Sequence, residues 1–360
     1  MTKLKNAIVL AAGGTGGHVF PAQALAKELK AEGYDVFILT DNRGYQFDLK
    51  GVSHIKIPAA QLGGSIDKKI KGSFKLMAGI AVALCHLRRL KPAVVVGFGG
   101  YASLPTMLAA IVLRIPTIIH QADAYFGRAN RVLAPFVTRI ATSFPHVENI
   151  PPSCQQKVSY TGLPVRSDIK FASYSVSKGK QAFHLLITGG SQGAKVFGEV
   201  IPQGIALLDT SLQKQIHVHQ QCRPEFLDRT QALYAKTKAQ VELAPFLKSM
   251  GDRYKKAHLF ISRAGASSVL EAALVGRPAL FIPYPYAMDD HQIYNAQEAV
   301  KAKGAWMMRE KEFTPEALCL FLSSLMASPQ KLEKAAANIQ TIAIIDATLR
   351  LTHLVKMIAA

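Results

Sequence analysis

The residues of this sequence that could do chemistry gather in glycine-rich turns. Glycines crowd residues 13–17 (GGTGG), 97–101 (GFGGY) and 189–194 (GGSQGA), each directly after an apolar run. A turn with almost no side chains lets backbone N–H groups approach a ligand at the positive end of the following helix. Such a turn can also join a strand to a helix and bind nothing. Because the arrangement is repeated, the sequence favours a site for phosphate or another anion.

His18 follows the first turn directly. An imidazole has a pKa near 6.5, so it can accept a proton from a substrate hydroxyl at neutral pH. We therefore predict that His18 is a general base. A hydrogen bond that only orients the substrate, or a purely structural role, is the alternative. The next candidates for the base are His120, Asp123 and His291, which we expect in loops at the same site.

A third helix start follows the strand that we predict at His258–Ser262. Its first amides, from Ala266 to Ser268, can bind a phosphate, and the Glu271 carboxylate can then accept hydrogen bonds from both hydroxyls of a ribose. Alternatively, Glu271 only complements the positive end of the helix dipole. A nicotinamide or flavin enzyme is disfavoured, because the fingerprint G-x-G-x-x-G beginning at Gly14 would need glycine where Val19 stands.

The sequence does not predict a metal site, and we expect no cofactor. Asp289 and Asp290 are adjacent, which is typical of a loop and helix start. His217 and His219 would share one face of a strand, but no third ligand stands nearby in the sequence. The cysteines are scattered, with no C-x-x-C pair, and this disfavours a zinc site or a disulfide framework and fits a reducing cytoplasm. They are Cys85, Cys154, Cys222 and Cys319.

Apolar runs alternate with helical patterns along the chain. Fully apolar strands between helices predict parallel sheets covered on both faces, in an α/β fold built from two doubly wound domains. In the first half, strands are predicted at Ala7–Ala12, Tyr34–Thr40, Ala93–Gly97, Thr117–His120 and Thr138–Thr142. In the second half, they are predicted after His184 and at Gln215–Gln220, Gln240–Ala244, His258–Ser262, Ala279–Pro283 and Ala305–Met308. Residues 151–183, rich in Pro, Ser and Lys, contain the predicted domain boundary.

Length and charge limit the classes of protein. The chain has 360 residues, which suits two domains, and its net charge of +19 predicts anionic partners. Nucleic acid, an acidic membrane surface and phosphorylated small molecules all fit this charge. Nucleic-acid binding is disfavoured, because basic residues interleaved with aromatic ones, or a known binding motif, are missing. The basic, then apolar, start of the chain is interpreted as a buried first strand, not as a signal peptide.

Residues 63–91 combine lysines with apolar side chains. We interpret them as a membrane-surface patch in which apolar residues enter the interface and lysines meet lipid phosphates. In the alternative, Ile66 to Phe74 pack into the core; residues 76–90 are expected to pack on the sheet. The apolar stretch 76–87 is shorter than the roughly 20 residues that span a bilayer. The lysines are Lys68, Lys69, Lys71 and Lys75, among Ile66, Ile70 and Phe74.

Several motifs together resemble the MurG family of bacterial glycosyltransferases, in the same order along nearly the whole chain. They are GGTGGHVFPAQALA (13–26), GFGGYASLP (97–105), TGLPVR (161–166), GGSQGA (189–194), SRAGASSVLEAALVGRPALFIP (262–283) and DDHQIYNA (289–296). The resemblance implies transfer of N-acetylglucosamine from UDP-N-acetylglucosamine to undecaprenyl-diphospho-muramoyl-pentapeptide (lipid I), forming lipid II for peptidoglycan. The alternative is another nucleotide-sugar glycosyltransferase of the same fold, with a lipid or small-molecule acceptor.

The resemblance also implies a GT-B fold, in which two Rossmann-like domains face a cleft. Residues 1–163 would bind the polyprenyl-diphosphate-linked acceptor and an anionic membrane surface, and residues 164–340 would bind the UDP-sugar. A C-terminal helix, residues 341–360, would return to the first domain, with Asp346 expected as its N-cap. The enzyme would be peripheral, at the cytoplasmic face of the inner membrane.

The same resemblance implies the site residues, with His18 as the catalytic residue. Leu247 lies where the backbone of the family reads uracil, Gln292 would contact sugar hydroxyls, and Asn295 would support that loop. The remaining implied substrate contacts are Thr15, Gly16, Gly17, Asp123, Arg166, Ser191, Ala266, Ser267, Ser268, Val269, Leu270 and Glu271.

One motif departs from the family pattern. Where the family usually reads H-E-Q-N, this chain has His120, Gln121, Ala122 and Asp123. Asp123 keeps a hydrogen-bond acceptor but loses the amide donors of Asn. Gln121 removes a carboxylate that could have accepted a proton.

The chemistry that the resemblance implies is a single in-line displacement that inverts the anomeric carbon. A base must take the proton of the acceptor 4-hydroxyl, and positive groups must stabilise the departing UDP. Helix starts predicted at Gly193 and Ala266, together with Arg166, can stabilise this charge without a metal.

Overall fold

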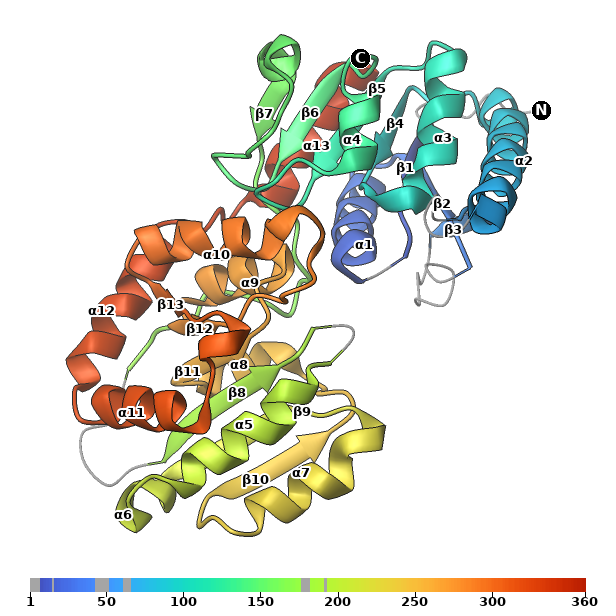
Figure 1. Ribbon diagram of the computed structural model, residues 1–360. Helices are drawn as coiled ribbons and strands as arrows, with labels where there is room; N and C mark the ends of the chain where they lie inside the picture. Colours follow the sequence, from blue (N-terminus) through green and yellow to red (C-terminus); the bar gives the residue numbers. More distant parts are fainter. Residues whose placement is uncertain (1–6, 15, 43–51, 61–65, 176–181, 191–192) are drawn as a thin grey trace. The chain divides into compact units, whose positions relative to one another are not determined.

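The chain folds into two compact α/β units. The computed structural model describes residues 7–14, 16–42, 52–60, 66–175, 182–190 and 193–360, with the backbone alone described for residues 66–70. The first unit comprises Met1–Arg166 and Ile344–Ala360, and the second comprises Ser167–Ala343. Each unit is built on one parallel sheet with helices on both faces (Figure 1).

The first unit has the strand order β3-β2-β1-β4-β5-β6-β7. Its strands are β1 (Ala7–Ala11), β2 (Asp35–Thr40), β3 (Ser53–Lys56), β4 (Val94–Gly97), β5 (Thr117–Gln121), β6 (Arg139–Thr142) and β7 (Val158–Tyr160). The strands predicted in this half are confirmed. The sequence analysis missed β3 and β7, which lie at the two edges and are partly exposed, so neither has the continuous apolar run of a central strand.

Helices cover both faces of the first sheet. They are α1 (Gly16–Ala31), α2 (Ile66–Leu90), α3 (Gly100–Val112), α4 (Arg128–Leu133), the short 3₁₀ helix η2 (Pro152–Lys157) and α13 (Ala347–Ala359). Successive residues of β1 point to opposite faces: Ile8 and Leu10 pack with α1 and α13, whereas Val9 packs with α2, α3 and α4. The C-terminal helix α13 thus belongs to the first unit (red in Figure 1).

Helix α1 begins earlier than its sequence pattern indicates. The glycine turn was expected to extend through Gly17, but Gly16, Gly17 and His18 already form the first turn of α1. At the other end, the Gly33 and Tyr34 amides donate to the carbonyls of Lys30 and Leu29. Gly33 has a φ of +88°, so it ends the helix as the sequence predicts.

The second unit has the strand order β10-β9-β8-β11-β12-β13, and the strands predicted in this half are confirmed. They are β8 (Phe183–Thr188), β9 (Ile216–Gln221), β10 (Gln240–Ala244), β11 (Leu259–Ser262), β12 (Ala279–Phe281) and β13 (Ala305–Met307). The helices are α5 (Lys195–Ala206), α6 (Thr210–Gln213), η3 (Pro224–Phe226), α7 (Leu227–Tyr234), α8 (Met250–Lys256), α9 (Ala266–Val275), η4 (Met288–Asp290), α10 (His291–Lys301), η5 (Glu310–Glu312), α11 (Pro315–Met326) and α12 (Pro329–Gln340). Helices α5 and α11 pack against the apolar residues of β8, β9 and β11.

Asp346 occupies the N-cap position of α13, as predicted, but its side chain does not cap the helix. Its carboxylate lies 2.8 Å from Arg350 Nε, one turn further along α13. Within the described ranges, no helix is both long enough and apolar enough to cross a bilayer.

Candidate active site

The first glycine turn is held by a buried aspartate at the end of β2. The Gly14 amide donates to Asp41 Oδ1 at 3.0 Å, and the Tyr101 hydroxyl donates to Asp41 Oδ2 at 2.9 Å. Gly14 has a φ of +81°, and a Cβ on Gly13 would lie 2.6 Å from Asp41 Oδ1. Only glycine fits both positions without a shift of the aspartate or the backbone. Asp41 therefore ties the first turn to the start of α3.

His18 lies against the second glycine turn. A Cβ on Gly100 would be 3.4 Å from His18 Nε2, and a Cβ on Gly99 would be 3.7 Å from His18 Cε1. Both glycines have positive φ, 85° for Gly99 and 70° for Gly100. The fold thus brings GFGGY beside the first turn of α1, and its bare backbone makes room for the imidazole. Gly16 and Gly17 precede His18 in this helical turn, whereas Thr15 lies outside the described residues.

His120, the second candidate for the base, is fully buried at the end of β5. Its Nε2 lies 3.3 Å from the Gly162 carbonyl and 3.3 Å from Ser143 Oγ, and its ring packs on Phe98. Burial lowers the pKa of His120 to about 4; the bond to Gly162 opposes this shift, and the nearby His18 adds to it. His120 is therefore a neutral, weakly basic imidazole at pH 7, which disfavours it as the base.

Arg166 is the last residue of the first unit before the chain enters the second unit. Its guanidinium lies 5.1 Å from the centroid of the Phe20 ring on α1. A cation over an aromatic face is attracted by the ring, and this contact orients the arginine beside the helix that carries His18.

In the second unit, α9 begins at Ala266, as predicted. Its N-cap residue, Gly265, provides no side-chain hydrogen bond to the first turn, and a Cβ there would meet nothing within 4 Å. The first amides of a helix have no acceptor within the helix, so they can donate to an anion. Ala266, Val269 and Leu270 are buried, whereas Ser267 and Ser268 are half-buried at this helix start.

Gln292 ties the start of α10 to two loops of the second unit. Its Oε1 accepts hydrogen bonds from the Ala264 amide at 3.2 Å and from the Tyr284 amide at 2.9 Å. Its oxygen is therefore occupied by hydrogen bonds within the protein, and its amide NH₂ is the group that can donate to a sugar hydroxyl. Asn295, fully buried, donates to the Ala264 carbonyl at 3.0 Å, which agrees with its expected supporting role.

Glu271 is half-buried in α9, and Tyr254 orients it. The Tyr254 hydroxyl donates to Glu271 Oε2 at 3.2 Å. Tyr254 is itself buried in α8, where its ring packs edge-on against Phe260 and its carbonyl accepts from Arg277 Nε at 2.6 Å. The Glu271 carboxylate, which we expect to bind a ribose, is thus oriented by a buried tyrosine.

The third glycine turn lies beside the start of α9. Strands β8 and β11 are neighbours, and the hydroxyls of Thr188 and Ser262 lie 3.2 Å apart at their carboxyl ends. A Cβ on Gly189 would lie 2.2 Å from the Ala194 amide nitrogen, so the turn requires glycine there. Helix α5 begins at Lys195, not at the predicted Gly193, which has a φ of +65° and belongs to the turn.

Two further predicted substrate contacts, Leu247 and Asp123, lie in described loops, whereas Ser191 lies outside the described residues. Leu247 is buried in the loop after β10, next to the exposed Phe246. Asp123 lies half-buried in the loop after β5, where its carbonyl accepts from the Gln121 side chain at 2.9 Å. Asp289 and Asp290 form a short 3₁₀ turn at the start of α10, as predicted.

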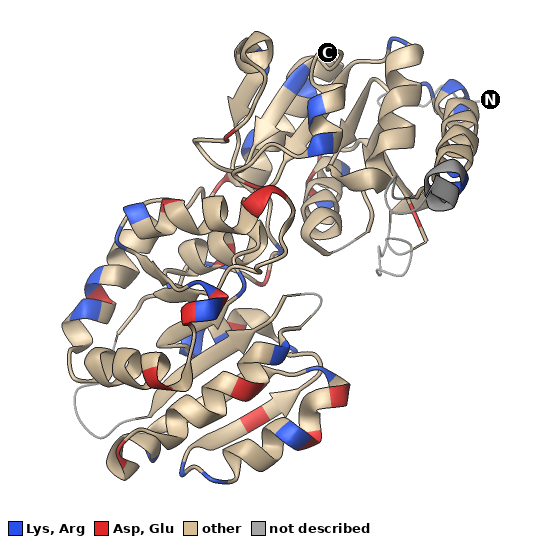
Figure 2. Ribbon diagram, viewed as in Figure 1, with Lys and Arg blue, Asp and Glu red and all other residues tan. Residues whose placement is uncertain are grey.

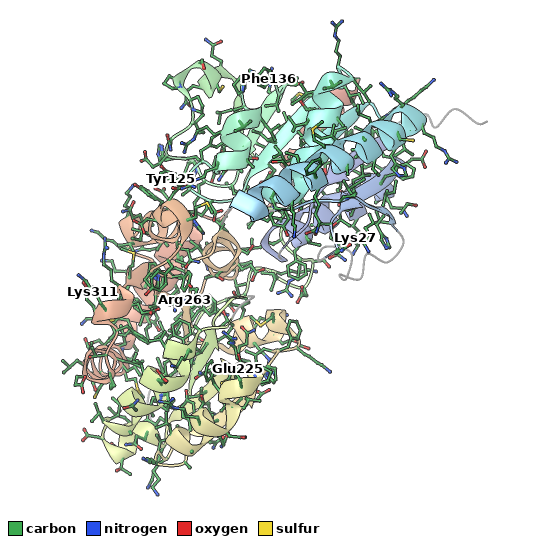
Figure 3. The ribbon with its side chains drawn as sticks, turned by 45° about the vertical axis from the view of Figure 1, so that its right-hand side comes forward. Lys27, Tyr125, Phe136, Glu225, Arg263 and Lys311 are labelled. Carbon is green, nitrogen blue, oxygen red and sulfur yellow. The ribbon has the colours of Figure 1, made fainter. Side chains whose placement is uncertain are left out.

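Several positioning residues were not found by sequence reasoning. The side chains of Asp41, Tyr101, Tyr254 and Gln121 form hydrogen bonds with residues far along the chain or across a loop. Arg263, labelled in Figure 3, donates to the Ile282 carbonyl after β12 at 3.2 Å. Their spacing carries no signal for such contacts. Across the described part of the chain, no three His, Cys, Asp or Glu side chains are grouped to hold a metal ion.

Comparison with known proteins decides the family. Residues 8–142 match the glycosyltransferase family 28 N-terminal domain, and residues 184–349 match the family 28 C-terminal domain. A protein of Paramagnetospirillum magneticum, named UDP-N-acetylglucosamine--N-acetylmuramyl-(pentapeptide) pyrophosphoryl-undecaprenol N-acetylglucosamine transferase, is 43% identical over 99% of this chain and 97% of its own length. A protein of the same name from Rhodospirillum centenum is 44% identical over 97% of this chain and 93% of its own. The chain belongs to the MurG family of glycosyltransferases.

A solved structure agrees with this assignment. The crystal structure of Acinetobacter baumannii MurG aligns with a TM-score of 0.79 at 30% identity, covering 98% of this chain and all of that one. The two parallel-sheet units are thus the two domains of a GT-B fold, as expected for the MurG family. The glycosyltransferase of kitacinnamycin shares the fold, with a TM-score of 0.70 at 16% identity.

Proposed function

We propose that this chain transfers N-acetylglucosamine from UDP-N-acetylglucosamine to undecaprenyl-diphospho-N-acetylmuramoyl-pentapeptide and forms lipid II. The observation that carries the proposal is the match, over nearly the whole chain, to transferases named for this donor and this acceptor. The open start of α9, with Glu271 one turn inside it, supports a nucleoside diphosphate as the donor.

The second unit provides most of the donor contacts in this proposal. The first amides of α9 and the residues from Ala266 to Glu271 take the phosphate and ribose, and the backbone near Leu247 takes uracil. Gln292 donates its amide to the sugar hydroxyls. Ser191 and Arg166 contact the nucleotide, and Thr15, Gly16, Gly17 and Asp123 complete the diphosphate and sugar contacts. The open N-terminus of α9 and the fixed Gln292 oxygen support these roles.

Transfer is one displacement at the anomeric carbon. The acceptor 4-hydroxyl oxygen forms a bond to this carbon while the bond to the β-phosphate oxygen breaks, and the carbon inverts. His18 takes the proton of the hydroxyl. UDP leaves with the bonding electron pair, and helix amides and the Arg166 guanidinium stabilise its charge. The position of His18 between two bare turns supports this role.

We also propose that α2 places the enzyme on the cytoplasmic face of the inner membrane as a peripheral protein. Phe74 and Met77 are 73% and 66% exposed. At 3.6 residues per turn, Phe74 lies about 60° from Lys71 and about 60° from Met77 around α2, and Lys75 lies on the other side of Lys71. Lys71 and Lys75 are exposed too. Figure 2 shows basic residues in blue on α2. Apolar side chains flanked by lysines suit an acidic lipid surface.

The alternative interpretation of this segment was that Ile66 to Phe74 pack into the core. Phe74 does not pack into the core, while the side chains of Ile66, Ile70, Lys68 and Lys69 lie outside the described residues. Residues 76–90 pack on the sheet along one side, through Ala83 and Leu87; their other side is exposed.

The test is transfer of radiolabelled N-acetylglucosamine from its UDP donor to lipid I in detergent micelles. We expect a labelled, lipid-extractable product that depends on lipid I and that UDP-glucose does not replace. Release of free sugar with no lipid product, or equal use of acceptors that lack the muramoyl-peptide, would instead support another glycosyltransferase of this fold.

A further inference from the structure

The side chain of Gln121 lies at the centre of the loop that joins β5 to α4. Its Nε2 donates to the carbonyls of Asp123 at 2.9 Å and Tyr125 at 2.8 Å. Its Oε1 accepts from the Gly127 amide at 3.2 Å and from Asn130 Nδ2 at 2.8 Å. Gln121 is 3% exposed, and its amide thus uses both donors and its acceptor inside the protein.

These contacts fix the orientation of the amide. Two carbonyl oxygens face Nε2, and two N–H donors face Oε1. Exchanging the two atoms would place an acceptor against the carbonyls and a donor against the N–H groups. A carboxylate has two acceptor oxygens and no donor. At this position, one of them would face the carbonyls of Asp123 and Tyr125 away from water, which is costly for a charged group.

The loop held by Gln121 joins β5 to α4 and contains a residue that we expect to contact the substrate. It contains Asp123, and its far end, Gly127, is the N-cap residue of α4. The loop is also tied to residue 148: the Phe126 amide donates to the Glu148 carbonyl, and the Glu148 amide donates to the Ala124 carbonyl, both at 2.8 Å. Tyr125, labelled in Figure 3, forms an isolated parallel β-bridge with Glu148.

We propose that Gln121 is a positioning residue, whose neutral amide sets the course of residues 122–127 and so holds Asp123 where the sugar substrate is bound. The assignment of Asp123 to the substrate rests on the proposed function above. Gln121 itself touches no substrate in this proposal. In this chain the amide fits the loop because each of its polar atoms has a partner of the opposite kind.

The chain contains a matched control in its second unit. Gln213 is 7% exposed; its Nε2 donates to the carbonyls of Ala206 and Leu208, and its Oε1 accepts from the Lys238 amide. Gln213→Glu therefore introduces the same conflict between a carboxylate and two carbonyls, at a position outside the site. Both variants should unfold at a lower temperature than the unchanged protein.

The experiment compares the kcat/KM of Gln121→Glu and Gln213→Glu with that of the unchanged protein from pH 6 to pH 8. Displacement of a substrate-positioning loop can lower the rate by up to about 100-fold, so we expect Gln121→Glu to lose at least about tenfold at pH 8. Burial among carbonyls raises the pKa of a glutamic acid, and its protonated form regains one donor. For Gln121→Glu, the kcat/KM relative to that of the unchanged protein should therefore rise as the pH falls. For Gln213→Glu, the relative kcat/KM should stay near one.

Two outcomes overturn the proposal: wild-type kcat/KM of Gln121→Glu at pH 8, or an equal loss in Gln213→Glu. If Gln121→Glu does not fold, Gln121→Met removes the hydrogen bonds without burying a charge. It should lower kcat/KM with a ratio that does not change with pH, and full activity of this variant also overturns the proposal.

A separate measurement distinguishes failure of this inference from failure of the proposed function. Absence of transfer by the unchanged protein contradicts the function alone. Hydrogen exchange of the Gly127 amide does not depend on any substrate. We expect this amide to be protected in the unchanged protein and to exchange faster in Gln121→Met; unaltered protection contradicts the positioning role.

Discussion

The hydroxyl of Tyr254 on α8 donates a hydrogen bond to the carboxylate of Glu271 on α9, over 3.2 Å. Tyr254 is 1% exposed and fixed by Phe260 and Arg277, so it holds the carboxylate from the protein side. One oxygen of Glu271 is thereby oriented before a ligand arrives. This preorganisation lowers the entropic cost of binding two hydroxyls.

Removal of either partner should weaken donor binding. We expect Glu271→Ala to lose about 1–3 kcal/mol of UDP-N-acetylglucosamine affinity, because hydrogen bonds to a charged group are lost. Tyr254→Phe should lose less, and it should have no further effect in the Glu271→Ala background. Isothermal calorimetry on the two single variants and the double variant measures both effects. Unchanged affinity of Glu271→Ala would mean that the residue only complements the helix dipole.

His18→Gln tests the general base. Glutamine keeps a hydrogen-bonding side chain but cannot accept the proton, and general base catalysis typically contributes about 10²–10⁴-fold. We expect kcat to fall by about this factor with little change in donor Kd, and the acidic limb of the pH–rate profile to disappear. A variant that keeps its kcat, or changes KM alone, would assign His18 to orientation and leave Asp123 and His291 as candidates.

Transfer should not depend on a divalent metal. Helix amides and the Arg166 guanidinium are expected to stabilise the departing diphosphate. Protein treated with EDTA and transferred to metal-free buffer should keep its kcat, and Arg166→Ala should lower it. Activity that disappears with EDTA and returns only with Mg²⁺ would contradict this expectation.

Membrane binding should depend on the exposed face of α2. Replacement of Lys71 and Lys75 by Ser should weaken binding to anionic vesicles, since each lysine near an acidic surface contributes roughly 1 kcal/mol, screened by salt. Donor affinity should stay unchanged. Lys331 and Lys334, exposed on α12, provide the matched control for a loss of two charges. If vesicle flotation is insensitive to salt and equal in both variants, α2 does not contact the membrane.

Acid should destabilise the protein through its buried histidines. Burial lowers the pKa of His120 to about 4; burial also lowers that of His184 to about 4, aided by His217 and His258. The unfolded chain takes up protons near pH 6.5, before the folded protein does, so stability present above pH 6.5 is lost as the pH falls toward 4. For His120 the loss is about 3 kcal/mol.

Urea unfolding at pH 7 and pH 4.5, followed by fluorescence, measures this loss. His120→Asn should be less stable than the unchanged protein at pH 7 but should depend less on pH. An NMR titration of His120 with a midpoint near 6.5 would contradict the shift and the predicted loss.

The sequence by itself determined the central strands of both sheets and the glycine turns that follow them. Central strands such as β1 and β8 are apolar throughout because helices cover both faces, and this pattern is local. The glycine turns could be predicted too, since positions such as Gly14 and Gly190 have positive φ. The helix start at Ala266 follows from its motif. Edge strands β3 and β7 could not be predicted, because their residues are exposed or half-buried and form no continuous apolar run.

Only the tertiary structure decided which side chains hold these turns. Asp41 meets Tyr101 and Gly14, and Tyr254 meets Glu271, across 17 to 60 positions of sequence. Residue types alone do not specify such pairs, because a hydrogen bond depends on distances of about 3 Å that packing of the elements sets. The same holds for His120, whose low pKa comes from its complete burial in the folded protein and not from its neighbours in the chain.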